Sequence, residues 1–181
     1  AWAAPIVNGE PITEADFPMT GALLIDAPYH QGDSEFRYAA LLCSSTLIAP
    51  DTVLLAAHCV DIESTSGGAI LTDEAELAWS QQADLTEWDL AGDPEGFPTD
   101  AITPRSWSLH PDYSYTMMTG ISGPDLALVF LDSPVPEWSL GWVPTADEDA
   151  QVVTGAEVTV VGWGIDQAVS QPQAGMGGQK K

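Results

Sequence analysis

Basic side chains are scarce in this sequence. It holds 4 lysines and arginines against 27 aspartates and glutamates, which gives a formal net charge of -23 over 181 residues. A surface with this charge repels phosphate groups and anionic lipid headgroups, so neither nucleic acid nor a membrane is expected as a partner. The sequence also lacks the run of about 18 apolar residues that a membrane-spanning helix requires.

Cysteine is also scarce, and the distribution of proline and glycine argues against long helices. The 2 cysteines, Cys43 and Cys59, are either buried thiols of a cytosolic protein or one disulfide of an exported protein. The 14 prolines and 16 glycines are spread along the chain and interrupt any helical pattern. Despite the charge, 45% of the residues are hydrophobic and 7 are tryptophans, which is enough for a folded core.

Short apolar segments alternate with turn residues such as Pro50-Asp51 and Gly123-Pro124. This alternation is typical of an all-β barrel or sandwich, and the length allows one large domain or one domain with part of a second. The pattern predicts strands at residues 21–25, 38–43, 46–48, 53–57, 125–131 and 158–161.

Residues 73–100 differ from this background because they carry many carboxylates and no basic residue. We expect a long solvated surface excursion, which is the usual form of an acidic run. A calcium loop is the alternative, since calcium binds clustered carboxylate oxygens, and its candidate ligands are Asp84, Glu87 and Asp89. The spacing matches no EF-hand loop, and we expect no other metal or cofactor.

The two ends of the sequence differ from its middle. Residues 1–5 are expected to be a leader or a residual pro-segment, since Ala1-Trp2-Ala3 has the small-x-small form of a signal-peptidase site. Residues 166–181 are rich in glutamine, glycine and alanine, and we expect a flexible loop. They finish in Lys180-Lys181, which is what a protease that cuts after basic residues leaves behind.

The densest pattern is the run Cys43-Ser-Ser-Thr-Leu-Ile-Ala-Pro-Asp-Thr-Val-Leu-Leu-Ala-Ala-His58-Cys59. A strand, a Pro-Asp turn and a second strand predict an antiparallel hairpin. A disulfide from Cys59 to Cys43 could close it, and in the chain-entropy model it would contribute about 3 kcal/mol. It would also hold the backbone beside His58, and a catalytic imidazole needs a fixed aim.

This run resembles the histidine motif of the trypsin/chymotrypsin-like serine peptidases, whose form is Cys-Ser-Gly-x-Leu-Ile, a turn, and Leu-Thr-Ala-Ala-His-Cys. Three further segments resemble motifs of the same family, in the same chain order: Ile6-Val-Asn-Gly9, then His110-Pro-Asp-Tyr113 with Gly123-Pro-Asp-Leu-Ala-Leu128, and Val158-Thr-Val-Val-Gly-Trp-Gly164. The resemblance extends from about residue 6 to about residue 164.

The resemblance implies a trypsin-like double β-barrel, of which this chain supplies the first six-stranded Greek-key barrel and the start of the second. We expect the first barrel over residues 6–145, with the acidic insertion at 73–100, and the first strands of the second barrel over 146–165. The resemblance also implies that Cys43 and Cys59 are bonded to each other.

The same resemblance implies two catalytic roles. His58 would be the general base, and Asp125 would orient its ring and stabilise the imidazolium. Taken alone, Asp125 would be a turn aspartate after Pro124. His30 and His110 are expected to be structural or solvated.

The sequence departs from the family pattern at Asn8, Ala56 and Pro124, where glycine, threonine and asparagine are usual. Residues 1–5 precede Ile6, so the free amine that completes the oxyanion pocket in the family does not exist in this form. The nucleophile motif Gly-Asp-Ser-Gly-Gly-Pro does not occur, and we expect Ser66-Gly-Gly68 to be a turn. The chain alone is therefore expected to be inactive.

These features predict one chain of a secreted, or alternatively periplasmic, serine endopeptidase that acts on proteins or peptides. A companion C-terminal chain would carry the nucleophilic serine. The alternatives are a non-enzymatic, protease-like binding module and an inactive truncation.

Overall fold

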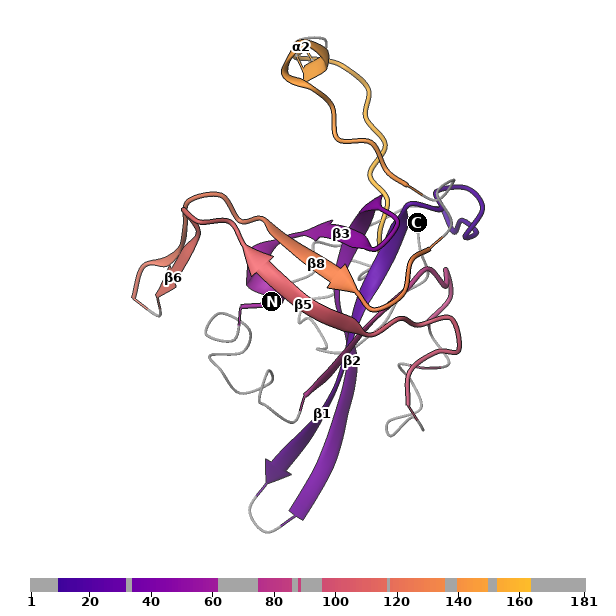
Figure 1. Cartoon of the computed structure of the whole chain (residues 1–181), viewed down its shortest axis with the longest axis vertical. Helices are drawn as coiled ribbons and strands as arrows, with labels where there is room; N and C mark the ends of the chain where they lie inside the picture. Colours follow the sequence, from indigo (N-terminus) through magenta and orange to yellow (C-terminus); the bar gives the residue numbers. More distant parts are fainter. Residues whose placement is uncertain are drawn as a thin grey trace.

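The computed structural model describes residues 10–31, 34–61, 75–85, 88, 96–116, 118–135, 140–149 and 153–163. The secondary structure of these residues is nearly all β, and most of the strands belong to one curled sheet (Figure 1). The strands of this sheet are β1 (Thr20–Gln31), β2 (Ser34–Ala49), β3 (Thr52–Leu55), β4 (Glu76–Ser80), β5 (Pro104–Leu109) and β8 (Ala127–Leu131).

Smaller elements lie in the connections. A hairpin of β6 (Ser114–Thr116) and β7 (Gly120–Ser122) projects beyond β5 and β8. The 3-10 turn η1 (Ala57–Cys59) follows β3, and the single-turn helix α2 (Ala146–Asp149) follows β8. None of the helical segments that the structure describes has the length and apolar character needed to cross a lipid bilayer.

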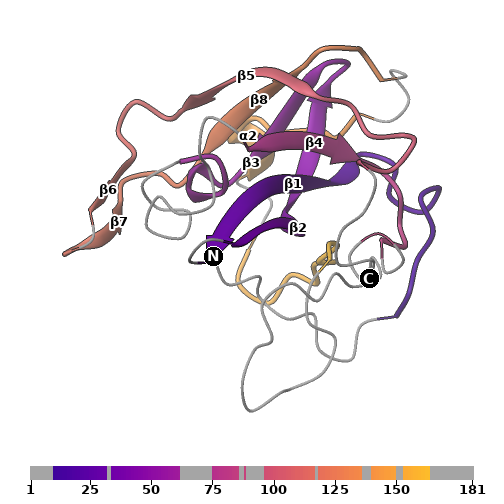
Figure 2. The same cartoon turned by 90° about the horizontal axis from the view of Figure 1, so that it is seen from below.

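The six strands are antiparallel neighbours in the order β4-β1-β2-β3-β8-β5, in which β4 returns beside β1 as in a Greek key. The sheet curls until β4 meets the segment that immediately precedes β5 (Figure 2). There the backbones of Trp79 and Ile102 exchange hydrogen bonds of 2.9 and 2.8 Å. The all-β barrel expected from the sequence is thereby confirmed.

The core follows from the alternation of side chains along the strands. Strands β3 and β8 bury every second residue, so each has one face toward the barrel interior and the other half covered. Strand β1 is buried on both faces: Leu23 packs in the main core cluster, and Leu24 packs in a second cluster with Leu85 and Trp163.

Several strand boundaries differ from the sequence-based expectation. The segments expected at 38–43 and 46–48 form one continuous strand, β2, which accommodates its neighbours through local register shifts. The strand expected at 53–57 ends at Leu55, because η1 begins at Ala57. The strand expected at 125–131 begins at Ala127, which leaves Asp125 in the preceding loop.

Two expectations are wrong. The segment 158–161 is not a strand, because it has no pairing partner among the described residues, and Val158 and Val160 are 70% and 68% exposed. The solvated excursion expected over 73–100 fails at its start, where Glu76–Ser80 forms β4 and buries Trp79. The apolar run within β4 is short and was masked by the acidic residues around it. Residues 1–5, 66–68 and 166–181 lie outside the described residues.

Arg105 on β5 fastens one end of the barrel. Its guanidinium donates a hydrogen bond of 2.7 Å to Asp51, donates another to the carbonyl of Leu131, and lies 5.8 Å from the ring centre of Phe130. The hydrogen bond from Arg105 lowers the pKa of Asp51 below its ordinary value. Since both charged side chains are well exposed, we assign this pair a structural role of small energetic weight.

Gly21 is required by the packing of Trp79. A Cβ at residue 21 would lie 2.2 Å from Cε2 and Cζ2 of that indole, a separation that nonbonded atoms do not reach. The indole Nε1–H donates to the hydroxyl of Ser45 at 2.9 Å, and that hydroxyl donates to the carbonyl of Gly21 at 2.9 Å. The close approach therefore lets one buried serine satisfy both the tryptophan and the strand backbone.

Gly21→Ala should lower the free energy of unfolding by about 1–3 kcal/mol, because the added methyl group overpacks the core. In a Trp79→Phe background, which lacks the clashing indole atoms, the same substitution should cost much less. Urea unfolding of the four proteins in a double-mutant cycle measures this coupling. An equal loss in both backgrounds would contradict the packing argument.

Candidate active site

His58 lies in η1, the turn that immediately follows β3. Its neighbours Ala57 and Cys59 are 0% and 1% exposed, so the turn is held in the core on both sides of the histidine. The histidine side chain itself remains 27% exposed. The local sequence thus produces a rigid turn with an imidazole at the surface.

Asp125 comes from a loop 67 residues further along the chain. Strands β3 and β8 are antiparallel neighbours, with Leu55 opposite Ala127. The end of β3 therefore lies at the same edge of the sheet as the start of β8. This pairing brings the turn after β3 and the loop before β8 together, and with them His58 and Asp125.

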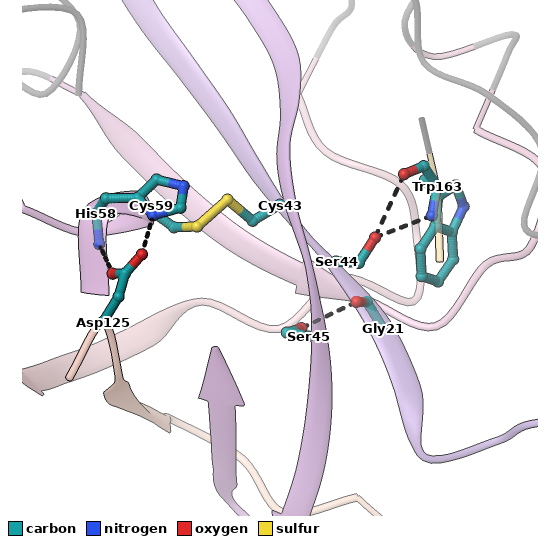
Figure 3. Close-up of a disulfide and its surroundings, with 8 residues drawn as sticks. All are labelled: Gly21, Cys43, Ser44, Ser45, His58, Cys59, Asp125 and Trp163. Atoms are coloured by element: carbon teal, nitrogen blue, oxygen red, sulfur yellow. Dashed lines mark hydrogen bonds and ion pairs between the residues drawn. A yellow bond between two sulfur atoms is a disulfide. The ribbon is translucent and has the colours of Figure 1, made fainter. Parts of the chain in front are cut away.

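His58 and Asp125 are joined by two hydrogen bonds, one from the ring and one from the backbone of the histidine (Figure 3). Nδ1 of His58 lies 2.6 Å from Oδ2 of Asp125, and the backbone N–H of His58 donates to Oδ1 at 2.9 Å. A carboxylate can only accept, so in the neutral ring the proton resides on Nδ1 and the lone pair on Nε2. The geometry leaves Nε2 as a base with a fixed orientation.

The ionisation of Asp125 suits this arrangement. Burial acts to raise its pKa, but the hydrogen bonds from the ring and backbone of His58 and the charge of the protonated ring outweigh that effect. The pKa of Asp125 therefore lies below its ordinary value. The carboxylate is ionised at neutral pH and stabilises the imidazolium that forms when His58 takes up a proton.

A disulfide joins Cys43 on β2 to Cys59 in η1, as expected, with an S–S distance of 1.98 Å. It ties the histidine turn to the strand next to β3. Cys43, Cys59 and His58 also bring three potential metal-binding atoms within 4.8 Å of one another. Because both sulfurs are bonded to each other, neither is the thiolate that a metal requires, and we assign no metal to this cluster.

The candidate calcium ligands are only partly described. Asp84 is exposed beyond β4, and its carbonyl accepts a hydrogen bond of 2.8 Å from the side chain of Gln82. Glu87 and Asp89 lie outside the described residues. The calcium loop therefore stays a prediction.

The other residues that the sequence analysis singled out lie in turns and loops or outside the described side chains. The ring Nδ1 of His110 accepts a 3.2 Å hydrogen bond from the backbone of Asp112, within a turn. The side chain of His30 is not among those described. Ala56 precedes η1 as its cap residue, and the carbonyl of Pro124 accepts from Leu126 in the loop that carries the aspartate.

Trp163 is held in place by hydrogen bonds that the sequence did not predict. Its backbone N–H donates to the hydroxyl of Ser44 at 2.9 Å, and its indole N–H donates to the carbonyl of Ala83 at 3.1 Å. Ser44 adjoins the disulfide, so Trp163 contacts the strand that supports the histidine turn (Figure 3). Since Ser44 and Trp163 are 119 residues apart, no local pattern links them.

Asp125→Asn should remove a pH-dependent part of the stability. Because folding lowers the pKa of Asp125, its contribution is complete above the ordinary value of 3.8 and is lost as the pH falls through the lowered one. The difference in free energy of unfolding between parent and variant should shrink from about pH 5 to about pH 1, as urea unfolding can measure. Asp112→Asn, which removes an exposed carboxylate nearby, is the control. A constant difference for Asp125→Asn would contradict the assignment.

Comparison with known proteins agrees with the motifs and the barrel. Residues 6–177 match the family model described as Trypsin. Over 127 residues the chain is 30% identical to a protein of Aedes aegypti named "Inactive CLIP domain-containing serine protease A3". The aligned part covers 70% of this chain and 24% of that protein, so the chain spans about a quarter of the relative it matches. Because the family match extends over most of its length, the chain belongs to the trypsin family of serine proteases.

Proposed function

We propose that this chain supplies the general base and its orienting carboxylate to a serine endopeptidase. The observation that carries the proposal is the 2.6 Å contact between Nδ1 of His58 and Asp125, which leaves Nε2 as the basic nitrogen. These 181 residues contain no Gly-Asp-Ser-Gly-Gly-Pro segment. The serine hydroxyl would therefore come from residues outside this sequence, and we place it on a companion C-terminal chain.

The reaction follows from the protonation state of the pair. Nε2 of His58 removes the proton from the serine hydroxyl as its oxygen attacks the peptide carbonyl carbon. The ionised Asp125 stabilises the resulting imidazolium, which then gives that proton to the leaving amine. Water, deprotonated by the same Nε2, attacks the carbonyl carbon of the acyl-serine, and the imidazolium returns this proton to the departing serine oxygen.

A projecting arm of the chain (residues 141–149 and 153–162) supports the presence of a partner polypeptide. Both of its ends are held on β2, through Gly141 bonded to Leu47 and through Trp163 bonded to Ser44, while its middle extends away from the sheet (Figure 1). Its exposed apolar residues are Trp142, Val143, Val153, Val158 and Val160, which are between 51% and 77% exposed. Several exposed apolar side chains on one segment are typical of an interaction surface.

The backbone of the arm supports the same partner. Residues 158–161 have no strand partner among the described residues, so their N–H and C=O groups can pair with a strand of another polypeptide. We propose that the polypeptide carrying the serine docks on this arm. The disulfide fits an exported protein, since disulfides persist in oxidising compartments.

The substrates would be proteins or peptides. The net charge of -23 favours basic substrates through long-range attraction, which weakens as salt is added. A second candidate function is a non-enzymatic binding module. It is favoured by the word "Inactive" in the name of the mosquito relative, and it requires no serine-bearing partner.

The complex can be isolated from its source by means of an affinity tag on this chain. In that complex, His58→Ala should abolish peptidase activity. We expect peptide hydrolysis to fall by about 10⁴-fold or more, because the base is lost, and labelling of the serine by a fluorophosphonate probe to fall with it. His30→Ala, which removes an imidazole at the far end of β1, should retain both. Unchanged labelling of the His58→Ala complex would contradict the role of His58 as the base, and no labelling of the parent complex would favour the binding module.

Val158→Asp with Val160→Asp should weaken docking of the companion chain by at least about tenfold, because the two charges would have to be buried on binding. Thermal unfolding of the chain alone should change little, since both valines are already exposed. Ile121→Asp, a single change of the same kind on the exposed β7, is the control for the two single valine variants, Val158→Asp and Val160→Asp, and should bind normally. Size-exclusion chromatography and denaturing mass measurement report the complex. A single covalent chain heavier than 19.1 kDa would contradict a separate companion.

A further inference from the structure

A tyrosine links the segments on which His58 and Asp125 stand. The hydroxyl of Tyr113 donates a 3.2 Å hydrogen bond to Oδ2 of Asp61, across 52 residues of sequence. Both residues are half-buried, and the tyrosine ring packs against the main core cluster. The bond is charge-assisted, because the acceptor is a carboxylate, and such bonds are stronger than those between neutral groups.

On one side, this link reaches the turn that carries His58. The backbone N–H of Asp61 donates to the carbonyl of Ala57 at 3.0 Å, and that of Val60 donates to the same carbonyl at 3.1 Å. Asp61 is therefore fixed to the last turn of η1. A displacement of the Asp61 carboxylate would therefore be transmitted to the backbone that sets the position of His58.

On the other side, the link reaches the loop that carries Asp125. The backbone N–H of Tyr113 donates to the carbonyl of His110 at 2.9 Å, and the N–H of His110 donates to the carbonyl of Leu126 at 2.8 Å. Two hydrogen bonds thus lead from the tyrosine to the residue that follows Asp125. The turn at 110–113 therefore supports the loop that carries Asp125 through the backbone of Leu126.

Gly123 keeps that turn and the aspartate loop in close contact. Its φ of +76° lies in the left-handed region that favours glycine, and a Cβ there would lie 1.9 Å from the carbonyl oxygen of Asp112. The backbones of the two segments therefore touch, with no side chain between them. A displacement of the 110–113 turn would be transmitted to Asp125.

We propose that Tyr113 and Asp61 are positioning residues for the His58–Asp125 pair. Their hydrogen bond closes a ring of contacts that runs from η1 through the 110–113 turn to the aspartate loop and back through the 2.6 Å Nδ1–Oδ2 contact. Within this ring the two loops cannot move apart without also breaking the hydrogen bond between Tyr113 and Asp61. The catalytic use of this rigidity rests on the proposed function, whereas the rigidity itself does not.

The ring N–H proton of His58, observed by NMR in the isolated chain, tests this proposal. Tyr113→Phe keeps the packed ring and removes only the hydroxyl. Exchange of the Nδ1 proton with water should become about two- to tenfold faster, as expected when one hydrogen bond no longer restrains opening. Tyr115→Phe, which removes a hydroxyl from β6 two residues away, is the matched control and should leave the exchange rate unchanged.

Variants of the acceptor distinguish positioning from simple loss of stability. Asp61→Asn retains an oxygen that accepts the tyrosine hydroxyl, and it should keep exchange within about twofold of the parent. Asp61→Ala should instead match Tyr113→Phe, with the amide spectrum of the barrel strands unchanged in both.

Parental exchange in both Tyr113→Phe and Asp61→Ala would overturn the proposal, as would an equal acceleration in Tyr115→Phe. Neither readout requires the serine. The positioning role can therefore fail while the peptidase function stands, and the peptidase function can fail while the ring of contacts is confirmed.

Discussion

The antiparallel pairing of β3 with β8 is the constraint on which the rest of the site depends. It sets Leu55 opposite Ala127 and so places the end of one strand beside the start of the other. The histidine turn leaves the first strand and the aspartate loop enters the second, and their contact follows from that register. A shift of one residue would exchange the buried and half-buried faces of both strands, so the core itself enforces the register.

Strand β2 connects the site to the rest of the molecule. Four residues within a short stretch of this strand each hold a different part of the molecule. Cys43 is bonded to the histidine turn, Ser44 accepts a hydrogen bond from Trp163, Ser45 accepts one from the indole of Trp79, and the carbonyl of Leu47 accepts one from Gly141 in the arm. The strand lies centrally in the sheet and is paired on both sides. The orientation of His58 and the position of the exposed arm therefore both depend on this one strand.

Local patterns determined which parts of the expectation were right. The hairpin around the cysteines was predicted because a strand, a turn and a strand lie within one short run, whereas the 3-10 turn that follows Leu55 was not predicted. Asp125 resembled an ordinary turn aspartate, and only its likeness to a family motif marked it out. The acidic run concealed β4, because composition averaged over residues 73–100 hides five residues that form a barrel strand. The valine-rich run at 158–161 has the propensity of a strand, but among the described residues it has no neighbour to pair with.

The sequence by itself determined the all-β class and the alternation that builds the core, and its likeness to a family motif marked His58 and the two cysteines, because each of these patterns lies in contiguous residues. Only the tertiary structure decided what His58 touches, where Trp163 is anchored and how Tyr113 reaches Asp61. Those contacts join residues 52 to 119 positions apart. They exist because hydrogen-bonded strands place distant segments at one edge of a sheet, a consequence of pairing and register that no local pattern contains.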